Sequence, residues 1–345
     1  PSRAQKICNQ FDLLISTVRP IRNAVTLILE SKNNLIASTG FCKLSNIKVN
    51  PYYLFALFKT NIFIKLLDRK TTATQYPAVN ENDILNLRIP LLSNSFQSQI
   101  ETSVKQAYAK QEQSKKLYHE AEEILLKELN LLEFTPTQFL TFSTSVKNIQ
   151  LVGRFDAEYF QPKYTQIENK IKNYKGGYDI IKNIFNLKKG VEVGADAYLE
   201  NQEGKGFYRV ADISPNSIRL TDKKISNELF YKLKNDFQPK IGDILFTKDG
   251  TIGISYLVNE NIEGIVSSAF LRLTLKKQFE HFNKETLTLI LNSPLCKLQC
   301  EKLSGGALIE HLKPCDFEKF FIPIIQKSVQ NQIQQRVQES YILKN

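Results

Sequence analysis

The sequence predicts an α+β fold of two related modules of strands and helices, the first of them incomplete, each followed by a long amphipathic helix. Three observations predict it. The run GDILFTKDGTIG at residues 242–253 has a partner in FDLLISTVRP at residues 11–20, 231 positions earlier. Residues 94–132 contain no Gly or Pro and have helical periodicity. Short apolar runs separated by turn residues surround both copies.

The repeat continues through both modules in the same order. Residues 37–44 match residues 266–273 at an offset of 229, and Asn50 matches Asn283 at an offset of 233. The offset of 233 also relates the Ile-Pro pairs that begin at Ile89 and Ile322. So long a period indicates two copies of one domain rather than a solenoid.

The first module is the shorter one, because the matching front of the second module would lie before Pro1. Phe155 opens the second module, and its counterpart would precede the chain by roughly 75 residues. The sequence also contains no methionine. We therefore expect the sequence to be part of a longer chain.

The elements follow from local patterns. In the first module, apolar runs predict short strands, Pro51 opens a helix over residues 52–67, and residues 84–92 predict a strand that Pro90 interrupts. In residues 94–132, apolar residues recur at threes and fours, so we expect one long coiled-coil-like helix. The predicted organisation is a first module at 1–93, a helix at 94–132, a linker at 133–154, a second module at 155–325 and the start of a second helix at 326–345.

The composition favours a polyanionic partner. The formal net charge is +11 over 345 residues. Residues 94–132 hold one more Glu than Lys, so the basic excess lies in the strand-rich modules. Nucleic acid is favoured over a membrane surface because no basic amphipathic helix stands out, and no apolar run is long enough to span a bilayer. The five cysteines lack zinc spacing, which predicts reduced thiols in a cytoplasmic protein with no metal site.

Catalytic patterns are missing from the sequence. It has no GxxxxGK[ST] phosphate loop and no glycine-rich methyl-donor loop, which excludes ATP-driven translocation and a visible methyltransferase site. His119, His281 and His311 have no nucleophile pattern around them that would make a triad. We expect no catalytic residue and no cofactor.

Several short motifs resemble one family in their order. They are FDAEYFQPK at residues 155–163, GDILFTKDGTIG at 242–253, SGGA at 304–307 followed by His311, and the closing Ile-Pro pairs. The order of module, helix, module and helix resembles the specificity (S) subunit of type I restriction-modification systems over essentially the whole chain. The resemblance implies two target-recognition domains that each read half of a bipartite site in double-stranded DNA, and long helices that pack antiparallel between them. It also implies that two methyltransferase (M) subunits dock on the helices, that restriction (R) subunits join through them, and that this subunit has no activity of its own.

Two other interpretations stay open. The chain is alternatively the specificity region of a larger fused restriction-modification enzyme, or a helical scaffold that binds no DNA. A methylase motif or a nuclease carboxylate cluster encoded upstream would favour the first of these. Duplex binding that is absent or insensitive to salt would favour the second.

Candidate DNA-binding residues are the polar and basic ones at predicted turns and loops. The turn of Lys248, Asp249 and Gly250 presents a lysine and backbone N–H groups suited to a phosphate, or is a hairpin turn with a solvated lysine. Gly305 and Gly306 let a backbone approach a phosphate, or only end a helix. The full candidate set is Arg19, Arg22, Thr72, Thr74, Gln75, Tyr76, Lys188, Lys189, Lys205, Arg209, Lys248, Asp249, Ser304, Gly305 and Gly306.

Overall fold

The computed structural model describes residues 2–30, 34–72, 77–199, 203–304 and 310–344. The chain divides into two compact units, Pro1–Glu112 and Gln113–Asn345, and the division falls inside the long helix α4 (Asn94–Glu128). Each unit contains one copy of the repeat and is described by itself. None of the helices in the described parts of the chain has the length and apolar character that crossing a bilayer requires.

The first unit is built around a three-stranded antiparallel sheet in which β2 lies between β3 and β5. The buried side chains of β2, Leu13 and Ile15 among them, form a core with the helices that follow. A separate antiparallel pair joins β1 to β4. The strands of this unit are β1 Ala4–Ile7, β2 Leu13–Ser16, β3 Val25–Leu27, β4 Ile36–Ser38 and β5 Phe41–Leu44.

The helix expected at 52–67 is two helices, α1 (Pro51–Phe58) and α2 (Asn61–Asp68). The break occurs because the Thr60 side chain accepts a hydrogen bond from the backbone N–H of Phe63 and so begins a new helix. Asn50 caps α1 in the same way, through Tyr52 and Tyr53.

The prediction of a strand over residues 84–92 is wrong. α3 (Glu81–Leu85) occupies its start, and residues 86–93 form no strand. In the second unit the corresponding segment is β16 (Phe321–Pro323), which pairs with β6 (Tyr178–Ile180). Among the described residues of the first unit, no strand pairs with residues 84–92.

The second unit repeats the sheet of the first and extends it. β12 lies between β13 and β15, as β2 lies between β3 and β5, and β7 adds a fourth strand beyond β15. The registers agree: Leu13 opposes Leu44, and Ile244 opposes Leu273. A second sheet has the order β11-β8-β14. The strands are β6 Tyr178–Ile180, β7 Phe185–Lys189, β8 Lys205–Tyr208, β9 Ile213–Ser214, β10 Ser217–Ile218, β11 Lys224–Ile225, β12 Ile244–Thr247, β13 Ser255–Leu257, β14 Gly264–Val266, β15 Phe270–Leu275 and β16 Phe321–Pro323.

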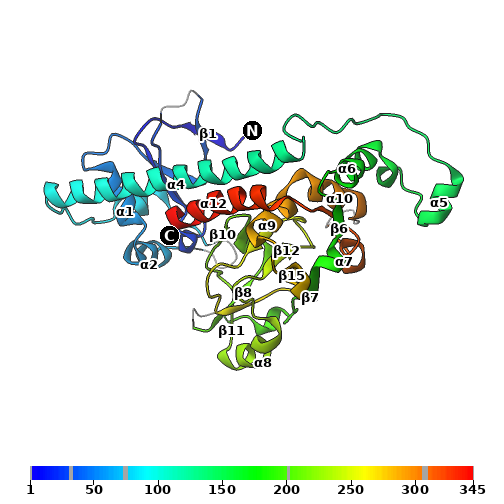
Figure 1. The fold of residues 1–345 in the computed structure, drawn as a ribbon. Helices are drawn as coiled ribbons and strands as arrows, with labels where there is room; N and C mark the ends of the chain where they lie inside the picture. The colour runs from blue at the N-terminus through cyan, green and yellow to red at the C-terminus, as the bar shows by residue number, and fades with distance from the viewer. Residues whose placement is uncertain (1, 31–33, 73–76, 200–202, 305–309, 345) are drawn as a thin grey trace. The chain divides into compact units, whose positions relative to one another are not determined.

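α9 packs against β13 of the larger sheet, and α8 packs against β14 of the other sheet. Figure 1 shows α8 next to β11 of that second sheet. The boundary between α9 and α10 falls at Ser293, the position equivalent to Thr60 in the first copy. The expected linker at 133–154 contains one short helix, α5. The helices are α5 Val146–Val152, α6 Pro162–Lys172, α7 Ile181–Ile184, α8 Asn227–Phe237, α9 Lys284–Asn292, α10 Pro294–Leu303, α11 Pro314–Phe317 and α12 Lys327–Lys344.

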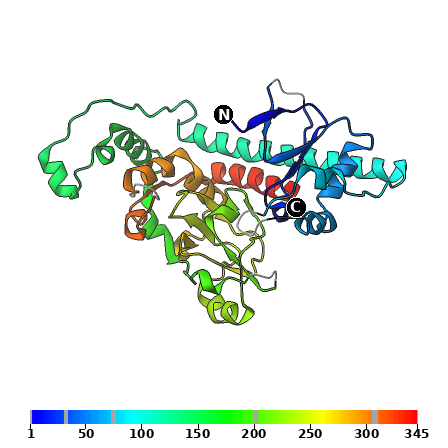
Figure 2. The same ribbon diagram turned by 180° about the vertical axis from the view of Figure 1, so that it is seen from behind.

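The long helices pair within the second unit. The last part of α4 runs antiparallel to α12: Ser114 meets Ser340, and further along α4 Glu120 meets Arg336. Figures 1 and 2 show α12, in red, alongside this part of α4. α4 ends at Glu128 rather than at residue 132 because Asn130 adopts a left-handed conformation (φ 54°) that closes the helix.

Candidate nucleic-acid interface

Each copy holds its central strand in place with one buried aspartate. In the second unit, Asp243 accepts a hydrogen bond from the backbone N–H of Lys240 at 2.8 Å and lies 3.6 Å from Arg272 Nε. In the first unit, Asp12 accepts from the backbone N–H of Asn9 at 2.8 Å and lies 3.6 Å from Lys43 Nζ. The aspartate shared by the two copies is therefore part of the scaffold, and the chemistry that distinguishes them lies beyond the strand.

Lys248 and Asp249 stand directly after β12 and are joined to each other. The ammonium of Lys248 lies 2.5 Å from the Asp249 carboxylate, and the Lys248 side chain is only 8% exposed. The turn therefore does not present Lys248 to solvent, contrary to both interpretations of this turn from the sequence. Gly250, which follows, has φ 73° and open space where a Cβ would stand.

His311 completes this cluster from a distant part of the sequence. Its Nδ1 lies 2.9 Å from Asp249 Oδ1, and the backbones of the two residues form an antiparallel bridge. The side chain of His311 is 61% exposed. Burial by itself would raise the pKa of Asp249, but hydrogen bonds from Lys248 and His311 outweigh it, so the pKa lies below its ordinary value.

Sequence reasoning assigned His311 no site role. The signal available in the sequence was the offset of 233, which matches His311 to Ala78 in the repeat. In the structure, the two segments that meet at His311 in the second copy also meet in the first. Val18 bridges Ala78 there, at the positions of Asp249 and His311. The backbone N–H of Arg19 donates to the carbonyl of Pro77, as that of Gly250 donates to Glu310. The backbone arrangement is therefore shared, whereas the side chains on it differ.

Two candidates of the first unit, Arg19 and Thr72, bond to this same segment. Arg19 has φ 49°, the counterpart of the left-handed Gly250, and Arg22 is exposed at the end of a short 3-10 turn. Thr72 exchanges two backbone hydrogen bonds with Ala78. The structure thus brings Arg19 and Thr72 to opposite sides of residues 77–78.

Besides Lys248, the second unit has four basic candidates, and three of these have acidic partners. Lys188, in β7, lies 2.5 Å from Asp236, and Lys205, in β8, lies 2.5 Å from Glu263. The Arg209 guanidinium lies 2.6 Å from Asp222. Lys189, at the end of β7, is exposed. These residues belong to two different sheets and do not form one cluster with Lys248.

The remaining candidates fall at the loop after the second helix of each copy. Ser304 ends α10 and is half-buried. Thr74, Gln75, Tyr76, Gly305 and Gly306 lie outside the described residues.

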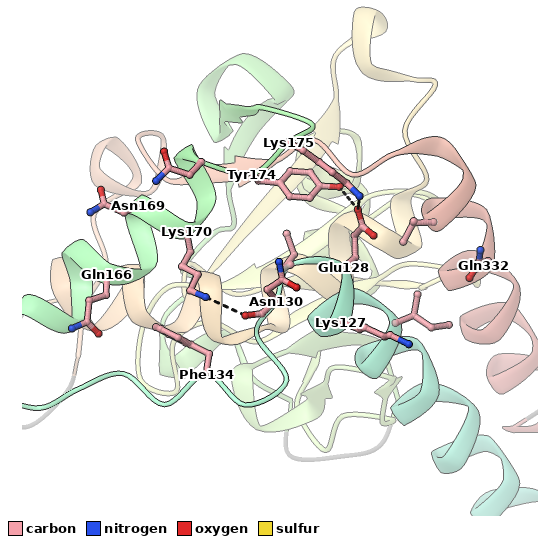
Figure 3. Close-up of a pocket in the computed structure, with 14 residues that line it drawn as sticks. Lys127, Glu128, Asn130, Phe134, Gln166, Asn169, Lys170, Tyr174, Lys175 and Gln332 are labelled. Carbon is pink, nitrogen blue, oxygen red and sulfur yellow. Dashed lines mark hydrogen bonds and ion pairs between the residues drawn. The ribbon is translucent and has the colours of Figure 1, made fainter.

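A separate hollow of about 1110 Å³ lies in the second unit between the end of α4, α6 and α12 (Figure 3). Four of its lining residues are engaged with one another or with the chain beside them. Glu128 accepts from Tyr174 at 2.7 Å and pairs with Lys175 at 3.1 Å, and Lys170 donates to the carbonyl of Asn130. The hydrogen bond from Tyr174 is the main reason that the pKa of Glu128 is lowered. The lining carries three lysines, Lys127, Lys170 and Lys175, against one glutamate, Glu128, and none of the candidates lines this hollow.

Metal ligation finds no support in the residues that the structure describes, because no group of three or more His, Cys, Asp or Glu side chains is close enough to hold an ion. Cys296 and Cys300 are buried, and burial raises the pKa of the Cys296 thiol well above its ordinary value. A thiol held in this protonated form is a poor metal ligand and a poor nucleophile.

Comparison with known proteins gives one family. Residues 178–341 match the family model described as the type I restriction modification DNA specificity domain. No curated protein matches the chain.

Solved structures from type I restriction-modification systems align along most of the chain. One, from a study of complex assembly and conformational transition of the type I R-M system, has 19% identity, a TM-score of 0.37, and coverage of 100% of this chain and 78% of its own. The HsdS subunit from Thermoanaerobacter tengcongensis has 20% identity, a TM-score of 0.35, and coverage of 100% and 77%. The S subunit from M. genitalium has 12% identity, a TM-score of 0.41, and coverage of 99% and 79%. Overall likeness at these TM-scores carries no argument about the site.

Proposed function

Residues 178–341 of this chain belong to the type I restriction modification DNA specificity family, and we propose that the chain directs partner methyltransferase and restriction subunits to a bipartite DNA site. The family match makes the chain a DNA sequence-specificity subunit, and the family implies a recognition role rather than a catalytic one. The two-part site, the M and R partners and the contacting residues are our proposal.

The observation that carries the proposal is the duplicated scaffold with different side chains on it. The backbone bonds that join the turn after the central strand to the segment around Ala78 or His311 occur in both copies. The turn itself carries Thr17 and Val18 in one copy and Lys248 and Asp249 in the other. One scaffold with exchangeable turn residues suits two domains that read two different half-sites, since base contacts specify the sequence whereas the scaffold only positions them.

The long helices supply a spacer of fixed length in this proposal. A helix rises about 1.5 Å per residue, so the rotational register of two recognition modules on the duplex would be set by the helix rather than by a flexible tether. Linkage of two modest half-site contacts raises the joint affinity only if their spacing matches the site. The antiparallel contact of α4 with α12 in the second unit supports a rigid spacer.

We assign DNA contact to the candidate residues in three groups. Exposed Arg22 and Lys189 are placed against phosphates, because neither is described with an acidic partner that would compete for its charge. Lys188, Lys205 and Arg209 would have to exchange an acidic partner for a phosphate. The third group is the rest of the candidate set, in which Lys248 acts through Asp249 because its side chain is buried. In the first unit it consists of Arg19, Thr72, Thr74, Gln75 and Tyr76, and in the second of Lys248, Asp249, Ser304, Gly305 and Gly306.

A duplex-binding experiment tests the DNA proposal. The purified chain is titrated with random-sequence duplex at low and at high salt in a gel-shift assay. We expect affinity that falls steeply with salt, because phosphate contacts release counterions. Absence of binding, or binding insensitive to salt, would favour the helical scaffold instead.

Mapping of methylated positions in the host genome by long-read sequencing tests the bipartite site. We expect two short half-sites separated by a constant unread stretch, and loss of that methylation when the gene is deleted. A methylase or nuclease domain encoded in the same open reading frame would instead favour the fused enzyme.

A further inference from the structure

Lys248, Asp249 and His311 form a polar cluster in the second copy. The first copy carries Thr17, Val18 and Ala78 at the same positions of the shared backbone. We propose that His311 contacts a base edge in the half-site read by the second module, and that Asp249 positions its ring for that contact. This inference rests on the proposed DNA-binding function and goes beyond it by assigning one base-reading residue and its positioning partner.

The geometry fixes how the imidazole is held. Because Lys248 and His311 keep the pKa of Asp249 low, the carboxylate is ionised and can only accept a hydrogen bond. The proton between Asp249 and His311 therefore sits on Nδ1. Among the described residues, none bonds Nε2, and the His311 side chain is 61% exposed. Nε2 is thus the edge that His311 offers to a ligand.

The charges of the cluster argue against a phosphate contact. The Lys248 ammonium is buried and lies 2.5 Å from Asp249, so the two charges neutralise each other. Lys248 supports the carboxylate that orients His311. A site that neutralises its own lysine contributes little to phosphate binding, which depends on free cationic charge.

Comparison of the two copies argues in the same direction. Both copies would need phosphate contacts equally, since the backbone is the same at both half-sites, whereas base contacts have to differ. At the positions of Lys248, Asp249 and His311 the first copy carries Thr17, Val18 and Ala78 on equivalent backbone bonds. A polar group present in one copy alone is what a base-reading role predicts.

Selection from a randomised duplex library tests the proposal with the full chain. Wild type, His311→Ala, Asp249→Asn and the matched control His119→Ala are each used to enrich binding sequences. The first copy carries alanine at the equivalent position, Ala78, on the same backbone bridge. His311→Ala is therefore compatible with this backbone arrangement. His119 is also exposed and also paired with carboxylates, those of Glu122 and Glu123, but on α4.

We expect His311→Ala to relax the preference at one base-pair position of one half-site, by on the order of tenfold, with the other half-site unchanged. Asp249→Asn should relax the same position, and His119→Ala should enrich the wild-type sequence. His311→Ala loses one hydrogen bond to Asp249, so its thermal midpoint Tm should fall by about 4 °C or less. A cooperative melt with this small a shift separates a reading role from a folding defect.

Two results would overturn the proposal while leaving the DNA-binding function intact. One is an unchanged preference at every position in His311→Ala. The other is a uniform loss of affinity with a weaker salt dependence, which would mark His311 as a phosphate contact. If the wild-type chain itself enriches no sequence, the proposed function fails and this inference fails with it.

Discussion

The side-chain carbonyl of Gln330 accepts a hydrogen bond from the backbone N–H of Asn283 at 2.9 Å, and its amide donates to the carbonyl of Ile325 at 2.7 Å. Gln97 makes the same two bonds in the first copy, to Asn50 at 3.1 Å and to Leu92 at 2.8 Å. Both glutamines are buried. In each copy, one glutamine of the long helix therefore ties that helix to its own module.

Gln330→Ala should destabilise the second unit. Two buried backbone groups would lose their partner, at a cost of about 1–3 kcal/mol each at most. We expect a loss of about 2 kcal/mol in the free energy of unfolding, measured by urea denaturation. Gln335→Ala is the control, because Gln335 is exposed on the same helix and bonds only Glu339. Equal stability of the two variants would contradict the structural role of Gln330.

Ser114 and Ser340 should show energetic coupling across the helix pair. Each hydroxyl donates to the other residue's backbone carbonyl, at 2.9 and 2.8 Å, and both side chains are buried. In a double-mutant cycle with Ser114→Ala and Ser340→Ala, we expect each single change to cost about 1 kcal/mol and the coupling to exceed about 0.5 kcal/mol. Strict additivity would mean that the two helices do not meet there in solution.

Gly190→Ala should be strongly destabilising. A Cβ at this position would collide with the backbone oxygens of Ser267 and Val266, which cannot swing away as a side chain can. We expect a cost of about 2 kcal/mol or more, because backbone shifts are needed to relieve the overlap. Gly40→Ala is the matched control, since the nearest atom to its Cβ would be Ser38 Oγ at 3.4 Å. A thermal melt of both variants checks the contrast.

The stability contributed by Asp249 should depend on pH. Its pKa in the folded chain is lowered, so its contribution is fully present above the unfolded-chain pKa of about 3.9 and is lost as pH falls through the lower folded value. Asn does not titrate. The difference in unfolding free energy between wild type and Asp249→Asn should therefore be largest near neutral pH and shrink below about pH 4. A constant difference across this range would show that Asp249 is not held ionised by its neighbours.

Insertion of four residues after Lys110 in α4 should lengthen the unread stretch of the proposed DNA site. Four residues add about 6 Å of helix, which corresponds to roughly two base pairs. We expect both half-sites to stay the same, as measured by methylation mapping. The same insertion after Ser143, in the linker, is the control and should leave the spacing unchanged. An unaltered spacing in the α4 variant would dismiss the helix as the spacer.

Local patterns predicted much of the fold because each pattern depends only on residues close together in the sequence. The helical periodicity of residues 94–132 depends only on neighbours three and four apart, so α4 was predictable to within a few residues of its end. The matching strands β2 and β12 were predictable because the same run occurs twice. The prediction of a strand at 84–92 was wrong because a strand forms only beside a partner strand. The pattern within one segment does not record whether such a partner lies beside it.

The sequence by itself determined the duplication, the long helix and the basic excess of the modules, because all three can be read from residue order and spacing. Only the tertiary structure decided which charges are available. It buries Lys248 against Asp249, and it brings His311 to Asp249 across 62 positions of sequence. It also pairs Ser114 with Ser340 across 226 positions. Burial and neutralisation depend on residues that are distant in the chain, and no local pattern records which distant residues will meet.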